Sequence, residues 1–198
     1  MLEQVDPLPR YLERTAEADF DDPRIQELLD QSGWRDLSEV AKAKAVFEFV
    51  RDEIPHSFDV QASVITCSAS EVLYHRTGLC YAKSHLAAAL LRAMGVPTGF
   101  CYQRLVLFED PADGYSLHGL NAVWLEGRWV RFDARGNKPG VDAQFSLDEE
   151  HLAFSVRESL NETDFPGIYA DANPNVLSAL RTATNAQTLY STGLPTDL

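Results

Sequence analysis

One segment of the chain, from Thr77 to Pro97, predicts a mostly apolar helix with a cysteine at its start. Gly78 interrupts the pattern that precedes this helix, and Gly95-Val96-Pro97 ends it. The apolar residues between them recur at helical spacing and are Ala82, Leu86, Ala89, Leu90 and Ala93. Cys80 stands in the first turn, where the partial positive charge of a helix N-terminus favours a thiolate over a thiol. Cys80 is therefore a candidate nucleophile, although most free cysteines act as small buried hydrophobic residues.

The segments on either side of this helix predict helices first and strands afterwards. Asp22-Pro23 is typical of a helix start, and Ser38 is a candidate cap for a second helix that stops at Pro55. Segments rich in β-branched and aromatic residues predict strands over residues 98–108, 117–125 and 128–134. Only Glu126-Gly127 separates the last two strands, which predicts a hairpin. This order of elements predicts an α+β fold.

The two ends of the chain predict less regular structure. Residues 1–22 are polar and rich in proline and acidic residues, and we interpret them as an arm on the surface. Asn173-Pro174 opens a predicted last helix, and the tail from Ser191 is expected to fray. No repeat, low-complexity tract or long linker divides the sequence, so all 198 residues are expected to form one domain, 1–198.

The charge and the cysteine content exclude several classes of protein. The formal net charge is -13, with 17 Lys and Arg against 30 Asp and Glu, so a nucleic-acid partner or an anionic membrane surface is not expected. We interpret the acidity as a source of solubility. Three cysteines make no disulfide framework, and the sequence has neither a secretory signal pattern nor an apolar run of the ~18 residues that a membrane span needs. A cytoplasmic protein with reduced thiols is therefore predicted.

The predicted hairpin brings a histidine close to a carboxylate. With a two-residue turn, Trp124 pairs with Trp129. The same register carried inward pairs Leu120 with Asp133, and His118 lies on the same face as Leu120. Diagonal neighbours on adjacent strands have Cβ atoms roughly 7–8 Å apart or less, a gap that longer side chains bridge. The register therefore allows a hydrogen bond between His118 and Asp133, in which the carboxylate fixes the imidazole tautomer.

Four segments resemble, in order and spacing, the transglutaminase-like superfamily. One is similar to the helix before the nucleophile, one to the Gly-x-Cys nucleophile motif, one to the helix end that leads into the first strand, and one to the hairpin that carries the histidine and the aspartate. They are residues 46–55, 76–80, 90–98 and 118–133. The resemblance covers about residues 40–135, which leaves residues 1–36 and 136–198 as flanking extensions of a stand-alone domain of bacterial type.

The resemblance implies a papain-like, transglutaminase-like fold in which the nucleophile-bearing helix packs on an antiparallel sheet. It implies a catalytic triad with Cys80 as the nucleophile, His118 as the base and Asp133 as the residue that orients it. The implied activity is thiol-dependent acyl transfer, with a thioester formed from an amide or ester of a peptide, protein or small molecule. Neither a cofactor nor a metal is expected.

The sequence departs from the family pattern at three places near the triad. Leu120 and Ala122 stand where the family often has a tryptophan and an acidic residue, and Ala134 follows Asp133 where the family often has proline. The calcium-binding and accessory β domains of animal transglutaminases have no counterpart in the sequence. Because of these departures, the resemblance does not identify the acyl acceptor.

Three other interpretations remain at this stage. The chain is a cysteine peptidase or amidase of the same fold, or a non-catalytic binding module that retains the fold. A zinc site built from Cys67, Cys80 and Cys101 lacks the usual ligand spacing. The second donor for an oxyanion also stays open, with Tyr74 and His75 as candidates, and the sequence does not give the oligomeric state.

Overall fold

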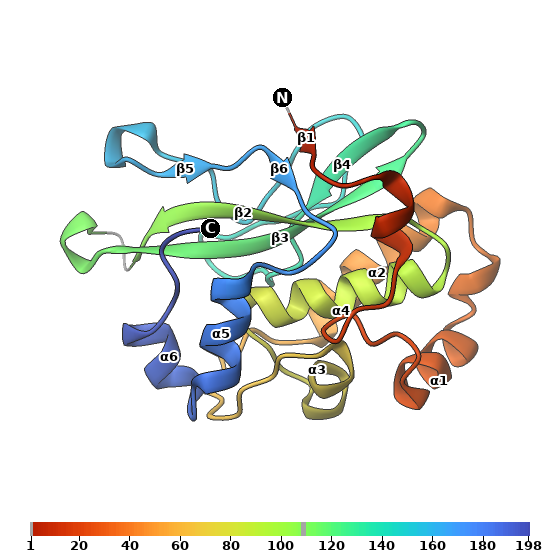
Figure 1. Ribbon diagram of the computed structural model, residues 1–198, viewed down its shortest axis with the longest axis horizontal. Coiled ribbons are helices and arrows are strands. Elements are labelled where there is room, and N and C mark those ends of the chain that lie inside the picture. The colour runs from red at the N-terminus through yellow and green to blue at the C-terminus, as the bar shows by residue number, and fades with distance from the viewer. Residues whose placement is uncertain (1, 108–109) are drawn as a thin grey trace.

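The computed structural model describes residues 2–107 and 110–198 (Figure 1), so Phe108, which ends the first predicted strand, lies outside the described residues. The helices are α1 (Pro23–Ser32), α2 (Glu39–Glu53), α3 (Ala69–His75), α4 (Cys80–Ala93), α5 (Pro174–Thr182) and α6 (Ala186–Thr192). The strands are β1 (Glu3–Gln4), β2 (Thr98–Val106), β3 (Tyr115–Leu125), β4 (Arg128–Phe132), β5 (Thr163–Asp164) and β6 (Gly167–Ile168).

Side-chain caps start the first two helices where the sequence predicts them. The Asp22 carboxylate accepts from the Arg24 N–H at the start of α1, and Ser38 accepts from the Ala41 N–H at the start of α2. Such caps satisfy backbone donors that have no partner within the helix. Helix α3 begins at Ala69, because Ser68 forms a capping box with Glu71.

The main sheet has the strand order β4-β3-β2-β5, with antiparallel neighbours throughout. The predicted hairpin is confirmed: Trp124 pairs with Trp129 across a turn at Glu126-Gly127. Both turn residues have positive φ, 51° and 80°, as the tight two-residue turns that match strand twist require. The predicted third strand ends two residues early, at Phe132. The α+β fold class is confirmed.

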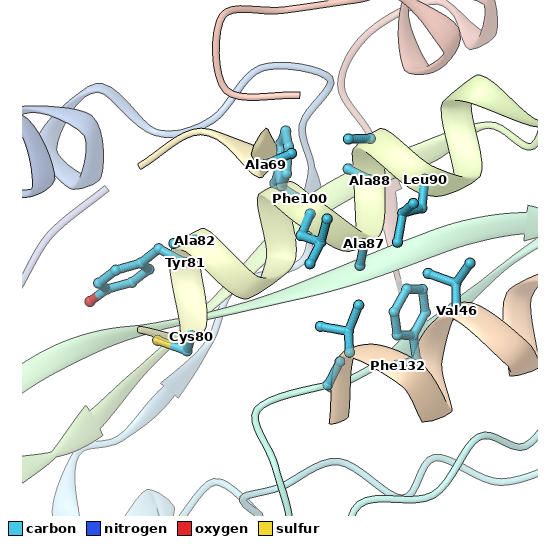
Figure 2. Close-up of a cluster of buried hydrophobic side chains, with 14 of the residues drawn as sticks. Val46, Ala69, Cys80, Tyr81, Ala82, Ala87, Ala88, Leu90, Phe100 and Phe132 are labelled. Carbon is cyan, nitrogen blue, oxygen red and sulfur yellow. The ribbon is translucent and has the colours of Figure 1, made fainter. Parts of the chain in front are cut away.

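Helix α4 forms the centre of the molecule, with β2 and β3 on one side and α2 and α3 on the others (Figure 1). Every residue from Cys80 to Arg92 is buried, including the polar Lys83, Ser84, His85 and Arg92. Figure 2 shows Val46 of α2 and Phe132 of β4 packed near Leu90, well along the helix from Cys80. The cysteine thus stands at the end of a rigid central element.

The N-terminal segment lies against the rest of the molecule, and one buried tyrosine anchors it there. Tyr11 is fully buried, and its hydroxyl donates to the carbonyl of Ile168 over 2.6 Å. Strand β1 pairs in parallel with β6, which joins the N-terminal segment to the last third of the chain (Figure 1). Among the described residues, none of the helices has the length and apolar character needed to span a bilayer. The cellular location stays a prediction.

Candidate active site

A glycine lets the cysteine-bearing helix approach the strand that carries the histidine. A Cβ on Gly119 would lie 2.8 Å from Cδ1 of Tyr81, too close for a side chain. The Tyr81 hydroxyl donates to the carbonyl of Leu117. These contacts, one on each side of His118 along β3, hold Cys80 and His118 at the same end of one cleft.

Asp133 is a buried carboxylate that accepts hydrogen bonds from three groups. Nε2 of His118 lies 2.7 Å from its Oδ2, and the backbone N–H groups of Arg135 and Ala153 donate to it over 3.1 Å each. Burial by itself raises the pKa of Asp133, but the charge of His118 and these hydrogen bonds lower it further than burial raises it. Asp133 is therefore ionised and fixed in place.

The imidazole of His118 is buried and lies between two acidic groups. Its Nε2 faces Asp133, which leaves Nδ1 for the side of Cys80. Burial lowers the pKa of His118, but the charges of Asp133 and Cys80 and hydrogen bonds to both raise it to about 10. The strand ladder that pairs Asn121 with Phe132 continues in the register from which the His118–Asp133 contact was predicted. The geometry is that of an acid–base pair beside a thiol.

A cleft of about 620 Å³ opens over Cys80 and His118. Its walls come from the loop after α2, from β2 and β3, and from several segments of the last third of the chain. The lining residues from that last third include Val141, Leu152, Ala153, Phe154, Tyr190 and Leu194. Apolar side chains thus make up much of the wall around the polar reacting groups, as in most small-molecule sites.

Aromatic contacts bind the last third of the chain to the cleft. The ring of Phe154 lies edge-on to His118, with centroids 5.0 Å apart. Tyr190 of α6 stacks on Phe58 with centroids 3.9 Å apart. Residues 136–198 therefore complete the cleft, a role that the sequence did not reveal.

An ion-pair cluster lies at one side of the cleft. The buried guanidinium of Arg135 donates to both oxygens of Asp59, and Nζ of Lys138 lies 2.8 Å from the same carboxylate. Burial raises the pKa of Asp59, but the two cations lower it to about 2. The cluster ties the loop after α2 to the segment that follows Asp133.

Lys83 is a buried amine one helical turn after Cys80. Its Nζ donates to the carbonyl of Ile54 just beyond the end of α2. Burial lowers the pKa of Lys83 to about 7. Sequence reasoning missed this residue, although a lysine in an otherwise apolar helix, three positions after the cysteine, is a usable signal.

The other cysteines and one histidine lie away from the cleft. Burial raises the pKa of Cys67 to about 11 and that of Cys101 to about 12. Nδ1 of His85 lies 2.7 Å from the carbonyl of Cys67, so this imidazole is held elsewhere. In the part of the chain that the structure describes, no group of three or more His, Cys, Asp or Glu side chains is arranged to hold a metal ion.

The two residues that the sequence offered as a second oxyanion donor lie outside the cleft. Tyr74 is 66% exposed and His75 is also exposed, both on α3, and neither lines the cleft. His56, which the sequence analysis did not single out, is buried and lines the cleft. No sequence pattern distinguished it, because the contacts that bury it come from distant segments.

Comparison with known families gives one match to a family model. The model of the transglutaminase-like superfamily matches residues 29–134, more than half of the chain, and includes Cys80, His118 and Asp133. The match begins upstream of the region in which the resemblance was seen. A search of curated proteins found no match.

Three solved structures resemble the chain at low sequence identity. A candidate cysteine protease from Cytophaga hutchinsonii is 20% identical, with a TM-score of 0.52 over 66% of this chain and 43% of that one. The periplasmic domain of TgpA from Pseudomonas aeruginosa is 20% identical, with a TM-score of 0.47 over 66% and 48%. A structure described as a TGase is 16% identical, with a TM-score of 0.47 over 86% and 48%. The chain thus spans less than half the length of each.

Proposed function

The chain belongs to the transglutaminase-like superfamily, and from this membership we propose that it is a thiol-dependent acyl-transfer enzyme with Cys80 as nucleophile. One observation carries the proposal: a buried His118–Asp133 pair and a cysteine at a helix start meet at one end of a cleft. We propose a peptide, a protein or a small amide or ester as the acyl donor.

The first half of the reaction forms a thioester. Nδ1 of His118 takes the proton of the Cys80 thiol, and Sγ attacks the carbonyl carbon, so a C–S bond forms and the carbonyl π electrons move onto oxygen. The backbone N–H of Cys80 is free to donate to this oxyanion, because the first N–H groups of a helix have no intrahelical partner. His118 then passes its Nδ1 proton to the leaving amine or alcohol as the C–N or C–O bond breaks.

The second half of the reaction releases the acyl group. An amine or water loses a proton to Nδ1 of His118 as it attacks the thioester carbon. The C–S bond breaks, and Cys80 leaves as a thiolate beside the protonated imidazole. Asp133 stays ionised throughout and holds His118 in one tautomer. An amine gives transfer and water gives hydrolysis.

Alkylation with iodoacetamide, mapped by peptide between about pH 5 and pH 9, tests the nucleophile first. In the wild type, Cys80 is expected to react at least ~10-fold faster than Cys67 and Cys101 at pH values well below the ~8.5 of a free thiol. Those two cysteines are internal controls, because burial raises the pKa of each. The substitution His118→Ala is expected to abolish the advantage of Cys80.

A second measurement separates the reaction classes. Intact-mass spectrometry after addition of p-nitrophenyl acetate reports an acetyl group on Cys80, and the product formed after addition of an alkylamine reports transfer. Loss of the acetyl group to water alone, with the amine ignored, would identify a hydrolase. A Cys80 that reacts as slowly as the other two cysteines would overturn the enzymatic proposal and favour a binding module.

A further inference from the structure

His56 has a rigid backbone next to the segment that leads into Cys80. It forms an isolated parallel bridge with Gly78, and the Ser57 N–H donates to the Gly78 carbonyl over 3.0 Å. The carbonyl of His56 accepts from the Asp59 N–H over 2.9 Å. Paired strands lie about 4.8 Å apart, so the imidazole is within reach of the space beside the first turn of α4.

The side chain of His56 is buried, and one of its two ring nitrogens has no polar partner among the described residues. Its residue is 3% exposed, and Nδ1 has no hydrogen-bond partner among the described residues. The ring packs edge-on against Tyr190, with centroids 6.0 Å apart, and lines the same cleft as Cys80 and His118. Because Nδ1 is enclosed by the protein, Nε2 is the ring nitrogen that remains for a ligand in the cleft.

The surroundings of His56 set its protonation state. Burial and the nearby charge of Arg135 hold the pKa of His56 well below its usual value, so the ring is neutral. A neutral imidazole carries one N–H. An unpartnered buried acceptor is tolerated more often than an unpartnered buried N–H, which favours the proton on Nε2 and the lone pair on the enclosed Nδ1.

We propose that His56 is a catalytic residue that donates its N–H to the substrate oxyanion, opposite the backbone N–H of Cys80. The proposal rests on the thiol acyl chemistry proposed above. When Sγ attacks, the carbonyl electron pair moves onto oxygen, and the hydrogen bond from His56 stabilises that charge without transferring its proton. An oxyanion is usually held by two donors, and His56 supplies the second one.

The test compares acylation with alkylation of the same thiol. Acetylation by p-nitrophenyl acetate passes through an oxyanion, whereas alkylation by iodoacetamide is a displacement at a saturated carbon and forms none. The variant His56→Phe keeps a ring against Tyr190 and removes the donor. Its acetylation rate is expected to fall about 10²- to 10³-fold, while its alkylation rate stays within about twofold of wild type. Unchanged alkylation shows that the triad is intact.

Two further variants serve as controls, one that retains a donor and one that provides a second donor-free side chain. His56→Gln retains an N–H donor of similar reach and is expected to acetylate within about tenfold of wild type. If His56→Phe does not fold, His56→Met is the donor-free variant and carries the same expectation. Wild-type and donor-free proteins that acetylate equally fast overturn the role of His56 and leave the proposed function standing. A wild type that is never acetylated overturns both.

Discussion

Two buried bases near Cys80 have pKa values that are shifted in opposite directions. Asp133 and Cys80 raise the pKa of His118 to about 10, whereas burial lowers that of Lys83 to about 7. The His118 contribution to stability is therefore full below pH 6.5 and is lost as the pH rises through about 10. The contribution of Lys83 to stability increases as the pH rises, because the unfolded chain binds more protons than the folded one between about pH 7 and 10.5. The two trends offset one another.

The substitution Lys83→Met should expose the loss of stability with rising pH that comes from His118, because Lys83 offsets this loss in the wild type. Between about pH 7 and pH 10, the wild-type free energy of unfolding is expected to change little, while that of Lys83→Met should fall as the pH rises. Urea titrations at several pH values measure both curves. Lys44→Met, at an exposed position on α2, is the control for removing a lysine and should reproduce the wild-type curve. Parallel curves for wild type and Lys83→Met would contradict the lowered pKa of Lys83 in the folded protein.

At the scale of elements, the approach of α4 to β3 depends on the absence of a side chain at Gly119. In Gly119→Ala, the new Cβ would meet the Tyr81 ring at 2.8 Å, so helix and strand must separate. The expected destabilisation is roughly 1–3 kcal/mol, the usual range for overpacking. Alkylation of Cys80 should slow as well, because the thiol moves away from His118. Urea denaturation and peptide-mapped labelling measure the two effects.

A double-mutant cycle with Tyr81→Ala isolates this contact. The variant Tyr81→Ala removes the ring atom that a Cβ at Gly119 would meet, and the next backbone atom lies at an ordinary 3.4 Å. The cost of Gly119→Ala is therefore expected to be smaller in the Tyr81→Ala background than in wild type. An equal cost in both backgrounds would place the strain elsewhere on the strand.

Local signals in the sequence were sufficient for the elements that build the triad. A helix cap at Ser38 and a two-residue turn at Glu126-Gly127 act over a few residues, so α2 and the β3–β4 hairpin follow from neighbouring side chains alone. The contact of His118 with Asp133 then follows from strand register. Its catalytic role stays a prediction until the labelling is measured.

Elements that depend on distant partners could not be predicted in the same way. Tyr11 is buried by residues far along the chain, among them Trp129 and Ile168. Helix α6 has no strong apolar pattern of its own and was missed, although its Tyr190 stacks on Phe58 at the cleft. His56 was not identified as a site residue for the same reason, since residues distant in the sequence bury it.

At the scale of the whole molecule, the last third of the chain is part of the site and not an appendage. It supplies Phe154 and Tyr190 to the cleft wall, and the carbonyl of Pro195 accepts from the Leu117 N–H over 2.7 Å, next to His118. The family core and this segment therefore both form walls of the cleft. We infer that specificity for the acyl donor resides largely in residues that lie beyond the region matched by the family model.

The net charge of -13 gives the molecule a negative field that should select among acyl acceptors. Cadaverine keeps one protonated amino group while the other attacks the thioester, so its local concentration near the protein is raised at low salt. The rate of acetyl transfer from Cys80 to cadaverine is expected to fall about three- to tenfold between low and high salt, because salt screens fields over a Debye length of roughly 30 Å at 0.01 M but only 3 Å at 1 M.

Methoxyamine is the matched acceptor, since it is neutral at the same pH and feels no such field. Its transfer rate should stay within about twofold over the same range of salt. If both amines respond alike, the local cations of the cleft, Arg135 and Lys138, cancel the field of the whole chain at the thioester. The difference between the two amines therefore measures whether acceptor choice is set by the overall charge or by the cleft.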